Sequence, residues 1–213
     1  MSSRFASVAV LALLLPALAF AAPKKPAPSP TETPIDIDAP STPAPDGGVD
    51  LDAAIEDAPA PTNAASGAAW IDKALGAKLA SPGVEWAMLS PVPEAPGARA
   101  AFLHVRGEKV RAMIVVGVDL APDPKDASGY AKKTFASLAE LGFEIQRKGP
   151  LKVAGKDAFA IAFVTKNALR RYEQYYVPGP KGSLVVLTFQ APAPIFDAEV
   201  KDFRTTAQGL AFR

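Results

Sequence analysis

The chain has 213 residues, of which 49% are hydrophobic and 21% charged, with a formal net charge of +1 and no cysteine. The lack of thiols excludes disulfides, thiol catalysis, cysteine-ligated metal sites and an acylated-cysteine anchor. Residues 23–66 hold two lysines against eight acids, a charge of −6, whereas residues 67–213 hold 20 lysines and arginines against 14 acids, a charge of +6. This mild basicity lacks the dense stripe of a nucleic-acid binder, so we expect no nucleic-acid partner.

Residues 1–21 have the pattern of a cleaved secretory signal peptide. A basic Arg4 precedes an apolar run over residues 8–20, and small residues follow, with the preferred cut after Ala21. The run is shorter than the roughly 20 residues that span a bilayer, so we expect no stable transmembrane anchor after cleavage; an uncleaved N-terminal anchor is the alternative. Both place the protein outside the cytoplasm, and the prediction is a periplasmic or secreted protein.

Residues 22–66 are predicted to be a disordered, Pro/Ala-rich acidic linker. Ten prolines lie between residues 23 and 66, and large apolar residues are too few to offset the entropy of ordering the chain. The few apolar residues alternate with acids in IDID (35–38) and VDLD (49–52). This composition favours a solvated spacer, and a short linear motif for a partner is the alternative.

Residues 67–213 read as one folded α+β domain. Two short strands, 76–80 and 85–89, flank the turn residues Ser81-Pro82-Gly83, and apolar alternation over 98–106 and 110–120 predicts a hairpin. Tyr130, Phe135, Leu138 and Leu141 recur at helical spacing and Gly142 follows, which predicts a helix over 130–141. Closely spaced strands with tight turns between them come next, over 143–148, 151–153, 156–165, 171–177 and 183–190.

A second core-facing helix is predicted over 196–212, where apolar residues return at steps of three and four. Consecutive strands joined by tight turns form an antiparallel sheet rather than parallel βαβ units. We therefore expect an antiparallel sheet of about six to eight strands with two packing helices.

Three stretches carry a family resemblance: LGAKLASPGVEW near the start, GKDAFAIAF in the middle, and SLVVLTFQAPAPIFDAEVKDFRTTAQGLAF at the end. Together they resemble the PsbP-like fold family, which includes the photosystem subunit PsbP and bacterial envelope proteins such as DcrB. The resemblance covers nearly all of residues 67–213 and implies an α/β/α sandwich that works as a binding or assembly module. It implies no ligand residues.

Catalytic patterns are missing from the sequence. His104 is the only histidine, and neither an acid–base partner nor further metal ligands are visible for it, so an ordinary strand histidine is favoured. The serines lack a G-x-S-x-G elbow, and no phosphate-binding glycine loop occurs. Asp119, Asp123 and Asp126 could offer oxygens to calcium but lack the EF-hand order, so a role at a helix N-terminus is favoured.

The sharpest candidate for function is NALRRYEQYYVPGPKG, residues 167–182. Its cations and aromatic rings are residue types favoured at interaction hot spots and at anionic surfaces, although strand alternation must turn part of the set inward. The predicted interaction surface consists of Arg170, Arg171, Tyr172, Tyr175, Tyr176 and Lys181. The alternative is a solvated, charged sheet edge.

Together these features predict a non-enzymatic, cofactor-free envelope module whose partner is an envelope protein or an anionic surface. A small-ligand or lipid carrier is the alternative, favoured by an apolar pocket of several hundred Å³. A hydrolase would require His104 to meet a carboxylate and a hydroxyl in a cleft.

Overall fold

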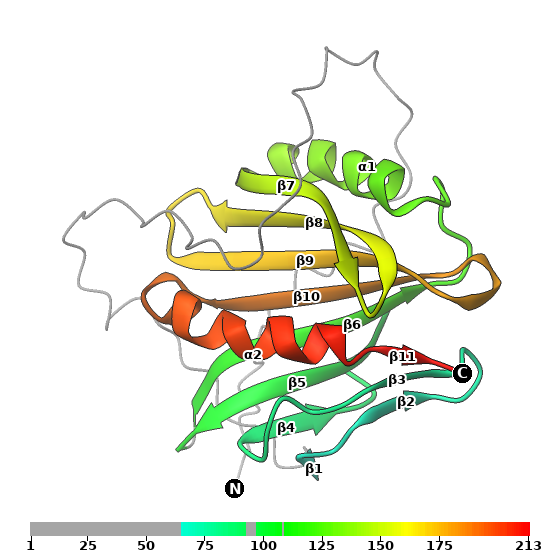
Figure 1. Cartoon of the computed structure of the whole chain (residues 1–213). Coiled ribbons are helices and arrows are strands. Elements are labelled where there is room, and N and C mark those ends of the chain that lie inside the picture. Colours follow the sequence, from blue (N-terminus) through cyan, green and yellow to red (C-terminus); the bar gives the residue numbers. More distant parts are fainter. Residues whose placement is uncertain (1–64, 93–96, 108) are drawn as a thin grey trace, which may run out of the picture.

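The computed structural model describes residues 65–92, 97–107 and 109–213 (Figure 1). The predicted signal peptide and all but the last two residues of the predicted linker lie outside these residues. The larger of two sheets contains β1 (Ala65–Ser66), β4 (Trp86–Leu89), β5 (Ala98–Arg106), β6 (Lys109–Asp119), β7 (Phe143–Val153), β8 (Lys156–Thr165), β9 (Arg170–Pro178) and β10 (Leu184–Pro192). The smaller contains β2 (Trp70–Asp72), β3 (Ala77–Leu79) and β11 (Ala211–Phe212).

The eight-stranded sheet has the order β1-β4-β5-β6-β10-β9-β8-β7, and its paired strands are antiparallel. Hairpins join most neighbours, but β10 returns to the centre and lies between β6 and β9. The helices are α1 (Ala127–Glu140) and α2 (Phe196–Gln208), with single 3₁₀ turns η1 (Pro180–Gly182) and η2 (Ala193–Ile195). The predicted α+β class, with an antiparallel sheet and two packing helices, is confirmed.

Each face of the large sheet is covered by different elements (Figure 1). Helix α2 and the small sheet share one apolar core with residues such as Trp86, Phe102 and Phe189, into which α2 inserts Phe203. Helix α1 covers β7, β8 and β9 on the opposite face, where its Leu138 belongs to a second core. The fold is thus a sandwich with the large sheet as its middle layer.

Three features differ from the sequence-based expectations. Residues 143–153 form one strand, because β7 is the last strand of the sheet and an edge strand tolerates the missing N–H of Pro150. Strands β3 and β4 do not pair with each other: β3 joins the small sheet and β4 the large one. Helix α2 ends at Gln208 because the chain then extends to form β11 against β3.

The pairing of β11 depends on a glycine. The amide of Arg213 donates to the carbonyl of Gly76 at 2.8 Å. Gly76 has a φ of +68°, and a Cβ there would meet the Arg213 carbonyl oxygen at 2.6 Å, so a larger residue would push the C-terminal strand away.

Both helices of the described chain fall short of the length and apolar character that crossing a membrane demands.

Candidate functional site

Strand β9 lies between the two helices and carries five of the six residues of the predicted surface. Its side chains alternate: Arg171, Glu173 and Tyr175 face α2, whereas Tyr172 and Tyr176 join the core beneath α1. The expected alternation is present, but both faces are covered, and every residue from Arg171 to Val177 is buried.

Burial corrects the expectation of an exposed aromatic and cationic cluster. Arg171, Tyr172, Tyr175 and Tyr176 are each at least nine-tenths buried, because β9 is an inner strand of the sheet with a layer on each side. Arg170 is half-buried and Lys181 is exposed, and they lie at opposite ends of β9. A role for these two in binding stays a prediction.

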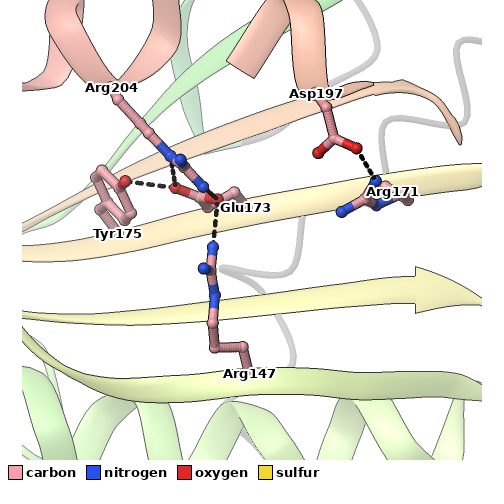
Figure 2. Close-up of polar contacts among 6 residues, drawn as sticks. All are labelled: Arg147, Arg171, Glu173, Tyr175, Asp197 and Arg204. Atoms are coloured by element: carbon pink, nitrogen blue, oxygen red, sulfur yellow. Dashed lines mark hydrogen bonds and ion pairs between the residues drawn. The ribbon is translucent and has the colours of Figure 1, made fainter. Parts of the chain in front are cut away.

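The centre of the α2 face of β9 is Glu173, which is 2% exposed. Its carboxylate accepts two hydrogen bonds from Arg204 of α2, at 3.0 Å from Nε and 2.8 Å from Nη2. Arg147 of β7 donates Nη2–H at 3.1 Å, and the Tyr175 hydroxyl donates at 2.5 Å (Figure 2). We call these four residues the Glu173 cluster; it joins α2, β7 and β9 through one buried charge.

The sheet register explains how Arg147 reaches Glu173 across β8. Arg147 pairs with Ala162, and Ala162 pairs with Glu173, so the three residues form one row. The small Ala162 leaves room for the arginine to pass over it. A bulge between Ile145 and Arg147 reverses the alternation of β7, which turns Arg147 toward α2 although Ile145 packs on the α1 side.

Helix α2 contributes polar residues along one flank at helical spacing. Asp197 accepts from Arg171 Nη1 at 2.9 Å (Figure 2). The Arg171 guanidinium also lies 4.4 Å from the centre of the Phe196 ring. Near the C-terminal end of α2, Gln208 donates to the carbonyl of Lys152 and accepts from the amide of Ala154, each at 3.0 Å. This flank therefore holds the helix to β9 and to the β7–β8 turn.

The hydroxyl of Tyr175 stays protonated at neutral pH and donates a hydrogen bond to Glu173. Burial, the negative charge of Glu173 and the hydrogen bond to it raise the pKa of Tyr175 far above its usual value. For Arg204, burial would lower the pKa, but the hydrogen bonds and charge of Glu173 outweigh burial and raise it. The cluster is a buried ion-pair network in which Nε of Arg147 has no hydrogen-bond partner, and its role is that of a structural clamp.

His104 has a partner that the sequence did not reveal. Its Nδ1 lies 2.5 Å from Oε2 of Glu199 on α2, and its ring stacks on Trp86 with the centroids 5.0 Å apart. Within the described residues no hydroxyl forms a hydrogen bond with His104. Both side chains are mostly buried, and the pair ties α2 to β5.

The three aspartates proposed for calcium have separate roles. Asp126 caps α1 by accepting from the amide of Gly129 at 2.7 Å, as its position before the helix predicts. Asp119 accepts from the Tyr130 hydroxyl at 3.0 Å, and Asp123 lies 3.8 Å from Lys133 Nζ. In the described chain no three potential His, Asp or Glu ligands gather around a point that could hold a metal ion.

An open hollow of about 490 Å³ lies where α1 ends and β7 begins. It is lined by Leu141, Gly142, Phe143, Thr165, Lys166 and Asn167. Leu141 is 46% exposed there, so part of the lining is an apolar side chain in contact with solvent.

The loop after β9 presents Lys181 on a rigid support. The Gly179 amide donates to the Ser183 carbonyl at 2.9 Å, and the amide and hydroxyl of Ser183 both donate to the Pro180 carbonyl. Lys181 itself has a left-handed φ of 57°, an uncommon conformation for a residue with a side chain. The loop thus projects one exposed cation from an ordered frame.

Comparison with solved structures identifies the architecture. The chain superimposes on the solution structure of cyanobacterial PsbP from Synechocystis with a TM-score of 0.53 and 15% identity, covering 72% of this chain and 96% of that one. The fold is PsbP-like. A protein of unknown function from Pseudomonas aeruginosa also matches, with a TM-score of 0.44 and 12% identity over 68% of this chain and 96% of that chain. No family model and no curated protein matches the sequence.

Proposed function

We propose that this PsbP-like protein is exported and acts in the bacterial envelope as a non-enzymatic binding or assembly module. The N-terminal sequence supports export, and the fold fits a non-catalytic module. The Glu173 cluster and the His104–Glu199 pair use their polar groups to hold α2 on the sheet, which leaves exposed loops as the surfaces that a partner can contact.

The observation that carries the proposal is the β9–β10 loop with Lys181 at its tip. Leu120, which is 63% exposed, directly follows Asp119, and Asp119 pairs with Leu184 at the end of this loop. An exposed cation and an exposed apolar side chain therefore lie at the same end of the sheet on ordered backbone. This combination suits a partner with an acidic and an apolar group, such as an envelope protein.

Site-specific photo-crosslinking in cells tests this surface. A benzoylphenylalanine at position 181 or 120 is expected to give the same adduct, and a probe at the exposed Ala139 of α1 serves as the control. Lys181→Glu is expected to abolish the adduct formed from position 120. Equal adducts from position 139, or none from positions 120 and 181, would refute the proposed surface.

The N-terminus of the mature protein tests export. Cleavage after Ala21 predicts an envelope protein that begins at Ala22. A protein that keeps Met1 and fractionates with the cytoplasm would contradict this part of the proposal.

A small-ligand or lipid carrier is the second candidate, and the hollow beside Leu141 is the observation that favours it. Native mass spectrometry of the purified protein decides between the two functions. A bound lipid that Leu141→Asp removes would support a carrier, whereas a bare mass for the unmodified protein would rule it out.

A further inference from the structure

The end of the sheet opposite Lys181 has polar groups on the α1 side of three adjacent strands. Tyr172 of β9 pairs with Gln190 of β10, and Gln190 pairs with Met113 of β6. Arg170 lies two residues before Tyr172 on the same side of β9, and its charge acts on the Tyr172 hydroxyl. Because adjacent strands are about 4.8 Å apart, Arg170, Tyr172 and Gln190 form one compact strip beside α1.

Cations without acidic partners surround this strip. Arg111 is the extra residue of a bulge in β6, two positions before Met113, and we count it as the fourth residue of the strip. Neither Arg170 nor Arg111 forms an ion pair with any residue of the described chain, and the same is true of Arg106 and Lys166 at this end of the sheet. Asp197, an exposed acid at the start of α2, bonds to Arg171 on the opposite face of β9, and the exposed Glu85, Glu140 and Glu144 precede β4, end α1 and begin β7. The strip therefore offers the half-buried guanidinium groups of Arg111 and Arg170 to an anionic group, and Tyr172 and Gln190, which are 7% and 8% exposed, form its floor.

The chain contains a segment of matching chemistry. Residues 23–66 have a charge of −6, and the acids of IDID (35–38) and VDLD (49–52) alternate with apolar residues. Residue 52 is 13 positions before Ala65 in β1, so extended chain reaches about 43 Å. The strand order places β9 five spacings from β1, which is about 24 Å. The acidic repeats can thus reach the strip of their own domain.

We propose that the acidic segment 35–57 docks in cis on the strip formed by Arg111, Arg170, Tyr172 and Gln190. Carboxylates of the segment accept hydrogen bonds from the arginines, and the apolar residues between them lie along β6. A short connection gives the segment an effective concentration in the millimolar range, so an external anionic partner must displace it. This inference does not depend on the partner proposed for the Lys181 loop.

Paramagnetic broadening in NMR spectra of the mature chain tests the docking. The protein has no cysteine, so Ala53→Cys places a single nitroxide next to VDLD. Amide signals at the start of β9, the end of β10 and the start of β6 are expected to be lost, while those around Lys181 remain. The lost signals should return at 1 M salt, where the Debye length is about 3 Å.

Charge variants separate docking on the strip from general attraction. Arg170→Gln, and independently Asp50→Asn with Asp52→Asn, should restore the lost signals, whereas the matched Lys181→Gln should not. The double aspartate variant lies outside the described domain and leaves its residues unchanged. Broadening that is uniform, centred on Lys181 or unaffected by these variants would overturn the proposal. A mixture of nitroxide-labelled and unlabelled protein is the last control. Broadening of signals from the unlabelled protein would place the segment on a second copy and would also overturn the proposal.

Discussion

Glu173 is a buried charge that joins α2 to β7 and β9. Two arginines from different elements depend on it for a counter-ion. Removing one member of such a network leaves the others charged and buried, and that loss costs more than the intact pair contributes. The stability lost on replacing Glu173 therefore comes mainly from the arginine charges that remain without its carboxylate.

Glu173→Gln keeps the size of the side chain and removes its charge. We expect the free energy of unfolding to fall by roughly 3 kcal/mol, because Arg147 and Arg204 lose their counter-ion. Urea denaturation monitored by circular dichroism measures the change. Asp157→Asn removes the exposed Lys152–Asp157 pair and should change stability by less than about 0.5 kcal/mol; equal effects of the two variants would show that Glu173 is not a clamp.

The tyrosines predict how stability depends on alkaline pH. Burial, a hydrogen bond to Asp119 and the charge of Asp119 raise the pKa of Tyr130 to about 12, and burial is the first cause of the raised pKa of Tyr172, Tyr175 and Tyr176. The folded state thus holds protons that the unfolded state releases near pH 10. Their contribution to stability is complete below pH 10 and is lost as pH rises toward 12 and beyond.

Absorbance of tyrosinate at 295 nm tests this dependence. At pH 11 the folded protein should contain much less tyrosinate than the same protein in urea, and urea midpoints should decline from pH 10 upward. Coincident titration curves for folded and unfolded protein would contradict the buried tyrosines.

Among the elements, helix α2 shows what local sequence patterns predict, and strand β7 shows what they do not predict. Apolar spacing predicted all 13 residues of α2 but continued the helix to residue 212, and alternation predicted most strands, because each depends on neighbours in the sequence. The bulge that turns Arg147 toward α2 depends on pairing with β8 instead. Gly149-Pro150 looked like a turn because the sequence did not show that β7 is an edge strand.

Ala162→Leu tests the row that joins β7 to β9. A larger side chain between Arg147 and Glu173 should cost about 1–3 kcal/mol through overpacking and should break the contact between the two. The expected signature is a smaller Arg147–Glu173 coupling in a double-mutant cycle made in the Ala162→Leu background. Ala139→Leu on the exposed face of α1 is the matched control, and an unchanged coupling would mean that Arg147 does not cross β8 at this residue.

For the whole molecule, composition and periodicity were sufficient to predict the α+β class, and the resemblance of three stretches predicted the PsbP-like fold, but neither predicted the interior of the candidate site. Arg147 meets Glu173 across 26 residues, and His104 meets Glu199 across 95. The first pair follows from the register of β7, β8 and β9 and the bulge of β7, and the second follows from the insertion of β10 beside β6; no local pattern indicates either. Arg171, Tyr172, Tyr175 and Tyr176 looked like surface residues because polar and aromatic side chains in a strand do not reveal that both of its faces are covered.

We propose that the polar groups of β9 hold the fold together while the exposed loop at Lys181 contacts the partner. The most direct test compares crosslinking from position 120 in Glu173→Gln and in Lys181→Glu, at a temperature where both variants are folded. We expect Glu173→Gln to retain the adduct and Lys181→Glu to lose it. An adduct lost in Glu173→Gln and kept in Lys181→Glu would contradict it.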